Sequence, residues 1–234
     1  MKNYTFLLCT LVFTSIVSAQ TKETPSQPPD WDTLIDQYEG ENLDLPNDPS
    51  LLLKSDIVVS EIDGLISKVL YLRSDKIQFR TMVLRNWQAV TSPSKAASYS
   101  ILFVNRYEPE LKVGLKLYKK TSIPTGFNED AMLGLYAGFR SKYQNRKFEI
   151  LMPPGTFQTG GYFSSLMNSP TYKTDIKYRN TGNPRTMFRN ISYYFSADDY
   201  AIVACIEGPA NLVEINKNTL ESFLQNLSTY EPKG

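Results

Sequence analysis

The sequence predicts an α+β fold in which an antiparallel β-sheet packs against a mid-chain helix and a C-terminal helix. Residues of one face recur at every second position from Met187 to Phe195 and again from Tyr200 to Ile206, a period typical of the two strands of a hairpin. Ser196 to Asp199 supply short polar side chains suited to the turn between them. A helical stripe at spacings of three and four then follows, formed by Leu212, Ile215, Leu220, Phe223, Leu224 and Leu227. A sheet covered by this final helix is therefore expected.

The first 19 residues have the pattern of a secretory signal. An apolar run of 12 residues, Phe6 to Val17, is too short to cross a bilayer as a helix. Val17-Ser18-Ala19 then places small residues where a signal peptidase cleaves. We therefore expect a secreted or periplasmic protein after removal of residues 1–19, with no membrane span. The rest divides into an acidic, proline-rich arm at 20–50 and a single α+β domain at 51–234.

Charge separates the arm from the domain. Between Gln20 and Gly64 there are 11 acidic and 2 basic residues, whereas from Leu65 onward there are 22 basic and 13 acidic residues. Residues 20–64, which contain the arm, thus carry a net charge of −9, and residues 65–234 carry +9. Two interpretations follow. The arm lies against its own domain, which tethering favours because it raises the local concentration, or the arm binds a basic partner.

The first half of the domain contains four predicted strands. Leu65 to Arg73 alternates strongly, and Lys76 to Leu84 leads into a strand that closes at Trp87. Ser98 to Tyr107 is apolar on both faces, as expected of a central strand. Lys112 to Lys120 alternates inward apolar residues with outward lysines. A basic row on a solvated strand usually serves solubility; the sharper interpretation is an anion-facing surface formed by Lys112, Lys116 and Lys120.

The second half begins with a helix. Asn128 is placed to cap it, and Glu129-Asp130 complement the helix dipole. Lys147 to Leu151 predicts a further strand, continued by Phe157 to Met167. The segment Asn168 to Pro184 is rich in Pro, Asn, Thr and Tyr and predicts a long exposed loop. The helix ends near Asn145, and its apolar stripe comprises Met132, Leu135, Tyr136, Phe139 and Tyr143.

The order of the predicted elements is carried by Phe79 to Trp87, Asn128 to Tyr143, and Asp199 to Val203 leading to Leu220-Glu221-Ser222-Phe223-Leu224. From about Leu65 to Tyr230 this order resembles the PsbP/Mog1-like family. The resemblance implies an antiparallel sheet with helices packed on it, in a protein that serves as an extrinsic subunit or a binding module. It transfers no functional residue, and fold does not fix function.

Histidine is absent from the whole sequence. Its absence excludes Ser-His-Asp and Cys-His catalysis and histidine-ligated metals. Cys205 lies on the strand face opposite Ile202 and Ile206 and is expected to be a buried, unreactive thiol. The sequence therefore favours a protein that is not an enzyme, with a hydrolase using serine or carboxylates as the remaining catalytic alternative.

No cofactor and no metal are predicted. The acidic residues of the arm lack the twelve-residue loop, with its glycine and final glutamate, that binds calcium. Gly160-Gly161 lacks the Lys-Ser/Thr that completes a phosphate loop. No nucleic-acid partner is expected, because no RNP-type or glycine-clamp motif accompanies the basic residues and a secretory signal argues against such a partner.

These observations favour a non-catalytic interaction protein, an accessory subunit that docks on a protein partner in a larger cell-envelope complex. A specific version is a plug or accessory subunit of an outer-membrane secretion channel or transporter. The alternative is a module that binds a small ligand or a glycan through the Tyr-rich segment 168–184. The expected interaction surface comprises Trp31, Tyr38, Lys112, Lys116, Lys120, Tyr172 and Tyr178.

Overall fold

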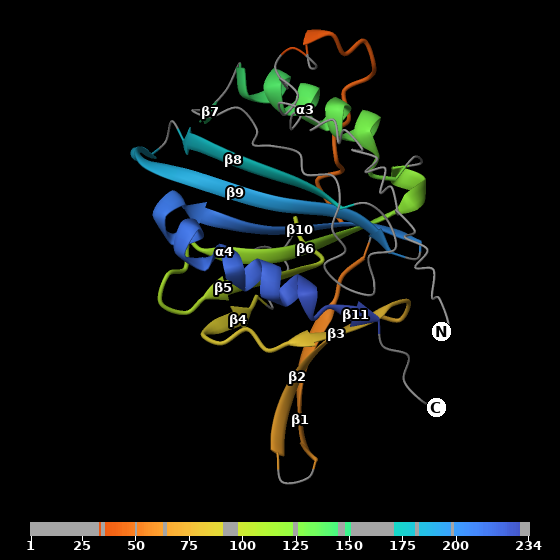
Figure 1. Ribbon diagram of the computed structural model, residues 1–234, viewed down its shortest axis with the longest axis vertical. Coiled ribbons are helices and arrows are strands. Elements are labelled where there is room, and N and C mark those ends of the chain that lie inside the picture. Colours follow the sequence, from red (N-terminus) through yellow and green to blue (C-terminus); the bar gives the residue numbers. More distant parts are fainter. Residues whose placement is uncertain are drawn as a thin grey trace, which may run out of the picture.

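Two antiparallel β-sheets and two α-helices make up the described part of the chain in the computed structural model (Figure 1). The structure describes Thr33 and residues 36–49, 51–62, 65–90, 98–123, 126–144, 148–150, 171–180, 183–197 and 199–229. The predicted signal at 1–19, Trp31 and the predicted continuation at 157–167 lie outside these residues. The predicted α+β class, with antiparallel strands and two packed helices, is confirmed, although the strands form two sheets rather than one.

The larger sheet has seven strands in the order β4-β5-β6-β10-β9-β8-β7. They are β4 (Trp87–Ala89), β5 (Ile101–Asn105), β6 (Lys112–Lys119), β7 (Phe148–Ile150), β8 (Tyr172–Asn180), β9 (Asn183–Ala197) and β10 (Tyr200–Pro209). The smaller sheet has four strands in the order β1-β2-β3-β11. They are β1 (Lys54–Ile62), β2 (Leu65–Arg73), β3 (Gln78–Met82) and β11 (Ser228–Thr229). The helices are α3 (Glu129–Gln144), α4 (Ala210–Gln225) and the short 3-10 helix η1 (Lys120–Ser122).

β10 lies at the centre of the larger sheet and supplies both main hydrophobic cores. It pairs with β9 from Tyr200–Ala197 to Pro209–Phe188, which confirms the predicted hairpin. Successive side chains of a strand point to opposite faces. Ile202 therefore packs in the core that contains α4, whereas Val203 packs in the core that contains α3. The two helices cover opposite faces of the larger sheet.

The C-terminal helix is confirmed, but one residue of its predicted stripe is wrong. Ile215 is 76% exposed, and Val213 is fully buried in its place. Two helical residues 2 positions apart lie about 200° apart around the axis, so burying Val213 together with Leu220 and Leu224 turns Ile215 toward solvent. Within the described residues, neither α-helix has the length and apolar content needed to cross a membrane.

The mid-chain helix begins where the sequence predicts. The Asn128 side-chain oxygen accepts a hydrogen bond from the Ala131 amide at 2.8 Å, the geometry of an N-cap. Met132, Leu135 and Tyr136 are buried against the larger sheet, and Phe139 is partly buried beside them. The helix ends at Gln144, one residue before the predicted end. The polar cap and apolar stripe together place α3 on the sheet.

The predicted strand from Lys76 to Trp87 is divided into β3 and β4. The Trp87 amide bonds to the Leu84 carbonyl at 3.3 Å, which closes a turn. Asn86 adopts a left-handed conformation with φ of 66°, a conformation that asparagine tolerates better than most residues. The turn directs β3 into the smaller sheet and β4 into the larger one.

The predicted loop from Asn168 to Pro184 is wrong, because residues 172–180 form strand β8. β8 pairs with β9 along its whole length, from Tyr172–Tyr194 to Asn180–Asn183. The period of two is present in the sequence, where Tyr172, Thr174, Ile176 and Tyr178 alternate with charged residues. Aromatic and β-branched residues at alternate positions favour a strand, and this local pattern outweighs the polar composition of the segment.

The smaller sheet shares a core with α4 and one face of the larger sheet. Leu70, Leu72 and Phe79 belong to the same buried cluster as Phe223 of α4. The Thr81 hydroxyl donates a hydrogen bond to the Phe223 carbonyl at 2.8 Å. α4 therefore lies across the larger sheet, and its C-terminal end reaches β3 and β11 of the smaller one (Figure 1).

Candidate functional site

The face of the larger sheet that α3 covers becomes polar where α3 no longer lies over it. A chain of polar contacts runs across three strands there. The Ser192 hydroxyl donates to the Asn190 side-chain oxygen at 2.6 Å, and the Asn190 amide donates to a Glu207 oxygen at 3.3 Å. The other Glu207 oxygen forms an ion pair with Lys112 at 3.6 Å. This chain forms one side of the candidate site.

Tyr99 forms a second wall because Gly114 leaves room for its ring. A Cβ at Gly114 would lie 2.3 Å from Tyr99 Cδ1, far inside van der Waals contact. The ring therefore lies directly over β6. The Cys205 thiol bonds to its hydroxyl at 3.9 Å, and the Lys116 ammonium lies 4.8 Å from its centroid, within cation–π range.

The acidic arm forms the opposite wall. The Leu43 amide donates to the Gly134 carbonyl of α3 at 3.0 Å, and Asp36 forms an ion pair with Arg140 at 2.7 Å. Leu43 and Leu45 pack against the core beneath α3. Of the two interpretations of the arm, the structure shows the first for residues 36–49: this part of the arm lies against its own domain.

Two glycines of α3 permit this close contact. A Cβ at Gly134 would lie 2.8 Å from the Glu41 carbonyl oxygen, and one at Gly138 would lie 3.1 Å from the Leu43 carbonyl oxygen. Residues four apart lie on the same face of a helix. The glycine pair thus makes a flat strip on α3 along which the backbone of the arm runs.

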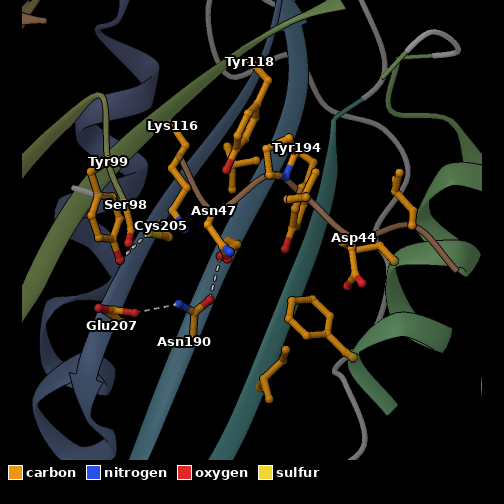
Figure 2. A pocket seen from close by; sticks show the side chains of 18 of the residues that line it. Asp44, Asn47, Ser98, Tyr99, Lys116, Tyr118, Asn190, Tyr194, Cys205 and Glu207 are labelled. Carbon is orange, nitrogen blue, oxygen red and sulfur yellow. Dashed lines mark hydrogen bonds between the residues drawn. The ribbon is translucent and has the colours of Figure 1, made fainter. Parts of the chain in front are cut away.

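A cavity of about 340 Å³ lies between the arm, α3 and the polar end of the sheet (Figure 2). Residues 43–47 supply the arm side, and Phe139 and Leu135 supply the α3 side. Figure 2 shows Lys116 and Tyr99 on the opposite side of the space from Asp44. The sheet side is formed by Lys116, Tyr118, Ile176, Tyr178, Asn190, Ser192, Tyr194, Val203, Cys205 and Glu207.

Burial keeps three titratable groups of the cavity wall in their neutral forms. Burial raises the pKa of the Cys205 thiol to about 12, so the thiol stays protonated at neutral pH and is a poor nucleophile. Burial also raises the pKa values of the Tyr99 and Tyr118 hydroxyls above their usual range. These phenols remain neutral hydrogen-bonding groups. Within the described residues, no group of three or more Asp, Glu or Cys side chains is placed to hold a metal ion.

The residues of the predicted interaction surface lie in different places. Lys116 and Tyr178 line the cavity, and Lys112 pairs with Glu207 at its edge. Lys120 is exposed but belongs to η1, not to the row of lysines on β6. Tyr38 donates to the Glu41 carbonyl within the arm at 3.2 Å.

Tyr172 is a correction to the predicted surface, because its side chain is only 6% exposed and belongs to the core beneath α3. Tyr178 is half-buried and stacks on Phe188, with ring centroids 5.8 Å apart. The predicted Tyr-rich binding loop is therefore replaced by one tyrosine in a cavity wall. Sequence analysis did not predict that Tyr99 and residues 43–47 take part in a site. The sequence contains only indirect indications of this: Gly114, over which Tyr99 packs, and the two α3 glycines at 134 and 138, against which the arm packs.

A second surface lies on the β1–β2 hairpin, which extends away from the rest of the molecule (Figure 1). Ile57, Val59 and Ile66 are 57%, 59% and 70% exposed. The strand register places all three on one face, the face that carries the buried Leu70 and Leu72 at the base of the hairpin. The hydrophobic core is thus continued by exposed apolar side chains, with the exposed Lys68 opposite Val59 on the same face.

β1 is also an edge strand among the described residues. It pairs with β2 on one side, and the order of the smaller sheet places no described strand on the other. An edge strand is a template for pairing with another chain, and β1 combines the apolar Ile57, Val58 and Val59 with the charged Lys54 and Asp56. The hairpin therefore has two features of a docking element, a free edge and an apolar face.

No protein-family model and no curated protein matches the chain. Several solved structures are similar to it in fold, and three of them follow. Cyanobacterial PsbP from Synechocystis sp. PCC 6803 is 11% identical with a TM-score of 0.49, covering 73% of this chain and 98% of that one. LpqN, described as involved in cell envelope biogenesis of Mycobacterium tuberculosis, is 10% identical with a TM-score of 0.38. The match covers 76% of this chain and 92% of LpqN.

The third is the Ran-binding protein Mog1p of Saccharomyces cerevisiae, which is 11% identical with a TM-score of 0.34 and covers 74% of this chain and 87% of that one. The resemblance to the PsbP/Mog1-like family predicted from the sequence is confirmed as a likeness in the arrangement of strands and helices. At these identities the likeness extends to no activity, ligand or partner.

Proposed function

We propose that this protein is a secreted, non-catalytic interaction protein that docks on a larger cell-envelope assembly through the β1–β2 hairpin. The observation that carries the proposal is the apolar face formed by Ile57, Val59 and Ile66. Burying such side chains contributes about 25 cal/mol per Å² of apolar surface. Leaving them in water on a projecting hairpin therefore favours a partner that covers them.

The free edge of β1 defines the partner further. An extended segment of a partner protein can add to β1 by backbone hydrogen bonds, while its apolar side chains cover Ile57 and Val59. The absence of histidine and the protonated Cys205 thiol support a non-catalytic role. An accessory subunit of an outer-membrane secretion channel or transporter is the specific form of this proposal.

The proposal is tested with a variant that removes the apolar face but keeps β-branched side chains, Ile57→Thr with Val59→Thr and Ile66→Thr. The matched control is Val58→Thr, because Val58 lies on the same strand but points to the other face. A photoreactive amino acid at position 59 in cells, followed by purification in mild detergent, identifies any partner.

We expect one envelope protein to crosslink at position 59 and to co-purify with the parent chain and with Val58→Thr. The triple variant should be as stable as the parent, because the substituted side chains are exposed, and should lose the partner. A parent chain that purifies alone at its monomer mass without a crosslink, or a triple variant that keeps the partner, would contradict the proposal.

A further inference from the structure

The described lining of the cavity contains one ammonium group, that of Lys116, together with the carboxylates of Asp44 and Glu207. Lys116 is half-buried, and its ammonium contacts the face of the Tyr99 ring. Among the described residues, no carboxylate forms an ion pair with Lys116. The nearby Glu207 has its own partners, because it pairs with Lys112 and accepts a hydrogen bond from Asn190. A lysine in a partly desolvated wall attracts an anion more strongly than one in open water.

The remaining walls are suited to the body of a small organic molecule. Tyr99, Tyr118, Tyr178, Tyr194 and Phe139 supply ring surfaces, and Ile176, Leu135 and Val203 supply aliphatic surface. Polar groups line the space as well, and two of them are held in place: the Tyr194 hydroxyl bonds to Thr174 at 3.2 Å and the Ser192 hydroxyl bonds to Asn190. Apolar and aromatic walls with placed polar groups are found in small-molecule sites.

The volume limits the size of the occupant. At about 340 Å³, the cavity is at the lower end of the range of small-molecule sites. A single ring with a short charged substituent fits this space, whereas a folded domain or an extended peptide is too large for it. Residues 43–47 of the arm form one side of this space.

We propose that this cavity binds a small organic anion, a carboxylate or a phosphate monoester on a ring-sized apolar body, with its charge on Lys116. The ring lies among the tyrosines, opposite the exposed Asp44. A neutral polyol leaves the Lys116 ammonium without an ion pair, and a cationic ligand would have to pair with Asp44 or Glu207 instead of Lys116. The site is separate from the hairpin, so this inference does not depend on the docking proposed above.

The test uses a charge series on one body: 4-hydroxyphenylacetate, its neutral amide 4-hydroxyphenylacetamide, and the amine tyramine, with phenyl phosphate as the phosphate monoester. Dissociation constants are measured by ligand-observed NMR on the full secreted chain. Lys116→Met removes the charge while keeping an unbranched side chain. Lys120→Met is the control, because Lys120 is exposed in η1 outside the cavity.

We expect at least one of the two anionic probes to bind the parent chain and Lys120→Met equally, and to bind Lys116→Met about 10-fold or more weakly, the effect of losing a hydrogen bond between charged groups. The amide and tyramine should bind the parent chain less tightly than the anions. Whether the carboxylate or the phosphate binds more tightly identifies which of the two anionic groups the site prefers.

Three results would overturn the inference: neither anion binds at millimolar concentration, the amide binds as tightly as the anions, or Lys116→Met binds the anions as the parent chain does. The affinities of the anion and the amide are compared on the parent chain, so this comparison tests whether the site prefers an anion even if Lys116→Met fails to fold. The triple hairpin variant should bind the anions normally, which separates failure here from failure of the docking proposal.

Discussion

Glycine at position 114 determines what can lie above β6. Glycine within a strand usually weakens it, and it often marks a close approach by another group. Here the approaching group is the Tyr99 ring, which in turn contacts Lys116 and Cys205. The absence of one side chain therefore sets the position of a cavity wall, an ammonium group and a thiol.

Gly114→Ala should lower the free energy of unfolding by about 1–3 kcal/mol, the usual effect of forcing extra volume into a packed site. The same substitution in a Tyr99→Ala background should have a much smaller effect, because the ring that the new methyl group meets is gone. Urea denaturation of the four chains gives this double-mutant cycle. Equal losses in both backgrounds would mean that the new methyl group clashes with something other than Tyr99.

At the scale of elements, the contact between the arm and α3 is made by backbone rather than by charge. The net charges of −9 for residues 20–64 and +9 for residues 65–234 suggest electrostatic attraction, but an exposed ion pair such as Asp36–Arg140 contributes only about 0–1 kcal/mol. The specific interactions are the hydrogen bond from the Leu43 amide to the Gly134 carbonyl and the partial burial of the Leu43 and Leu45 side chains. The glycine strip on α3 makes them possible.

The substitution Gly134→Ala distinguishes the stability of helix α3 from the contact between α3 and the arm. Alanine stabilises a helix by about 1 kcal/mol relative to glycine, yet its Cβ would lie 2.8 Å from the Glu41 carbonyl oxygen. We therefore expect faster hydrogen exchange of the Leu43 amide, without loss of protection within α3. Ser141→Ala, on the exposed side of the same helix, is the control. Unchanged exchange at Leu43 in Gly134→Ala would show that the arm does not depend on this strip.

The elements with a clear period were predicted from the sequence, and those whose position depends on partners were not. The β9–β10 hairpin, the Asn128 cap and the inward row Val113, Leu115 and Leu117 follow from local alternation and capping. Ile215 was misplaced because apolar spacing alone does not determine which side of a helix meets the sheet. The cavity was missed because its walls come from segments far apart in the chain, from residue 43 to residue 207.

At the scale of the whole molecule, one core joins the two sheets. Phe223 of α4 packs with Leu72 and Phe79 of the smaller sheet and, edge to face at 6.3 Å between ring centroids, with Phe103 of the larger one. Aromatic pairs of this geometry contribute beyond their buried area. The two sheets are therefore expected to unfold together.

Phe223→Ala should lower the free energy of unfolding by about 3–5 kcal/mol, as for other buried phenylalanines. Amides of β2 and of β10 should lose protection from hydrogen exchange together, because the lost side chain supports both sheets. Ile215→Ala on the exposed side of the same helix should change stability by less than about 0.5 kcal/mol. Opening of β2 while β10 stays protected would show that the sheets are separate folding units.

The larger sheet also acts as a partition. The base of the β1–β2 hairpin packs in the core on the α4 side of the larger sheet, whereas the cavity lies on the α3 side. A protein seated on Ile57 and Val59 therefore leaves the space beside Lys116 open, and a molecule held there leaves the hairpin free. Under the two proposals above, both surfaces could be occupied at once, and this chain would then bring a small molecule and a macromolecular assembly together without either displacing the other.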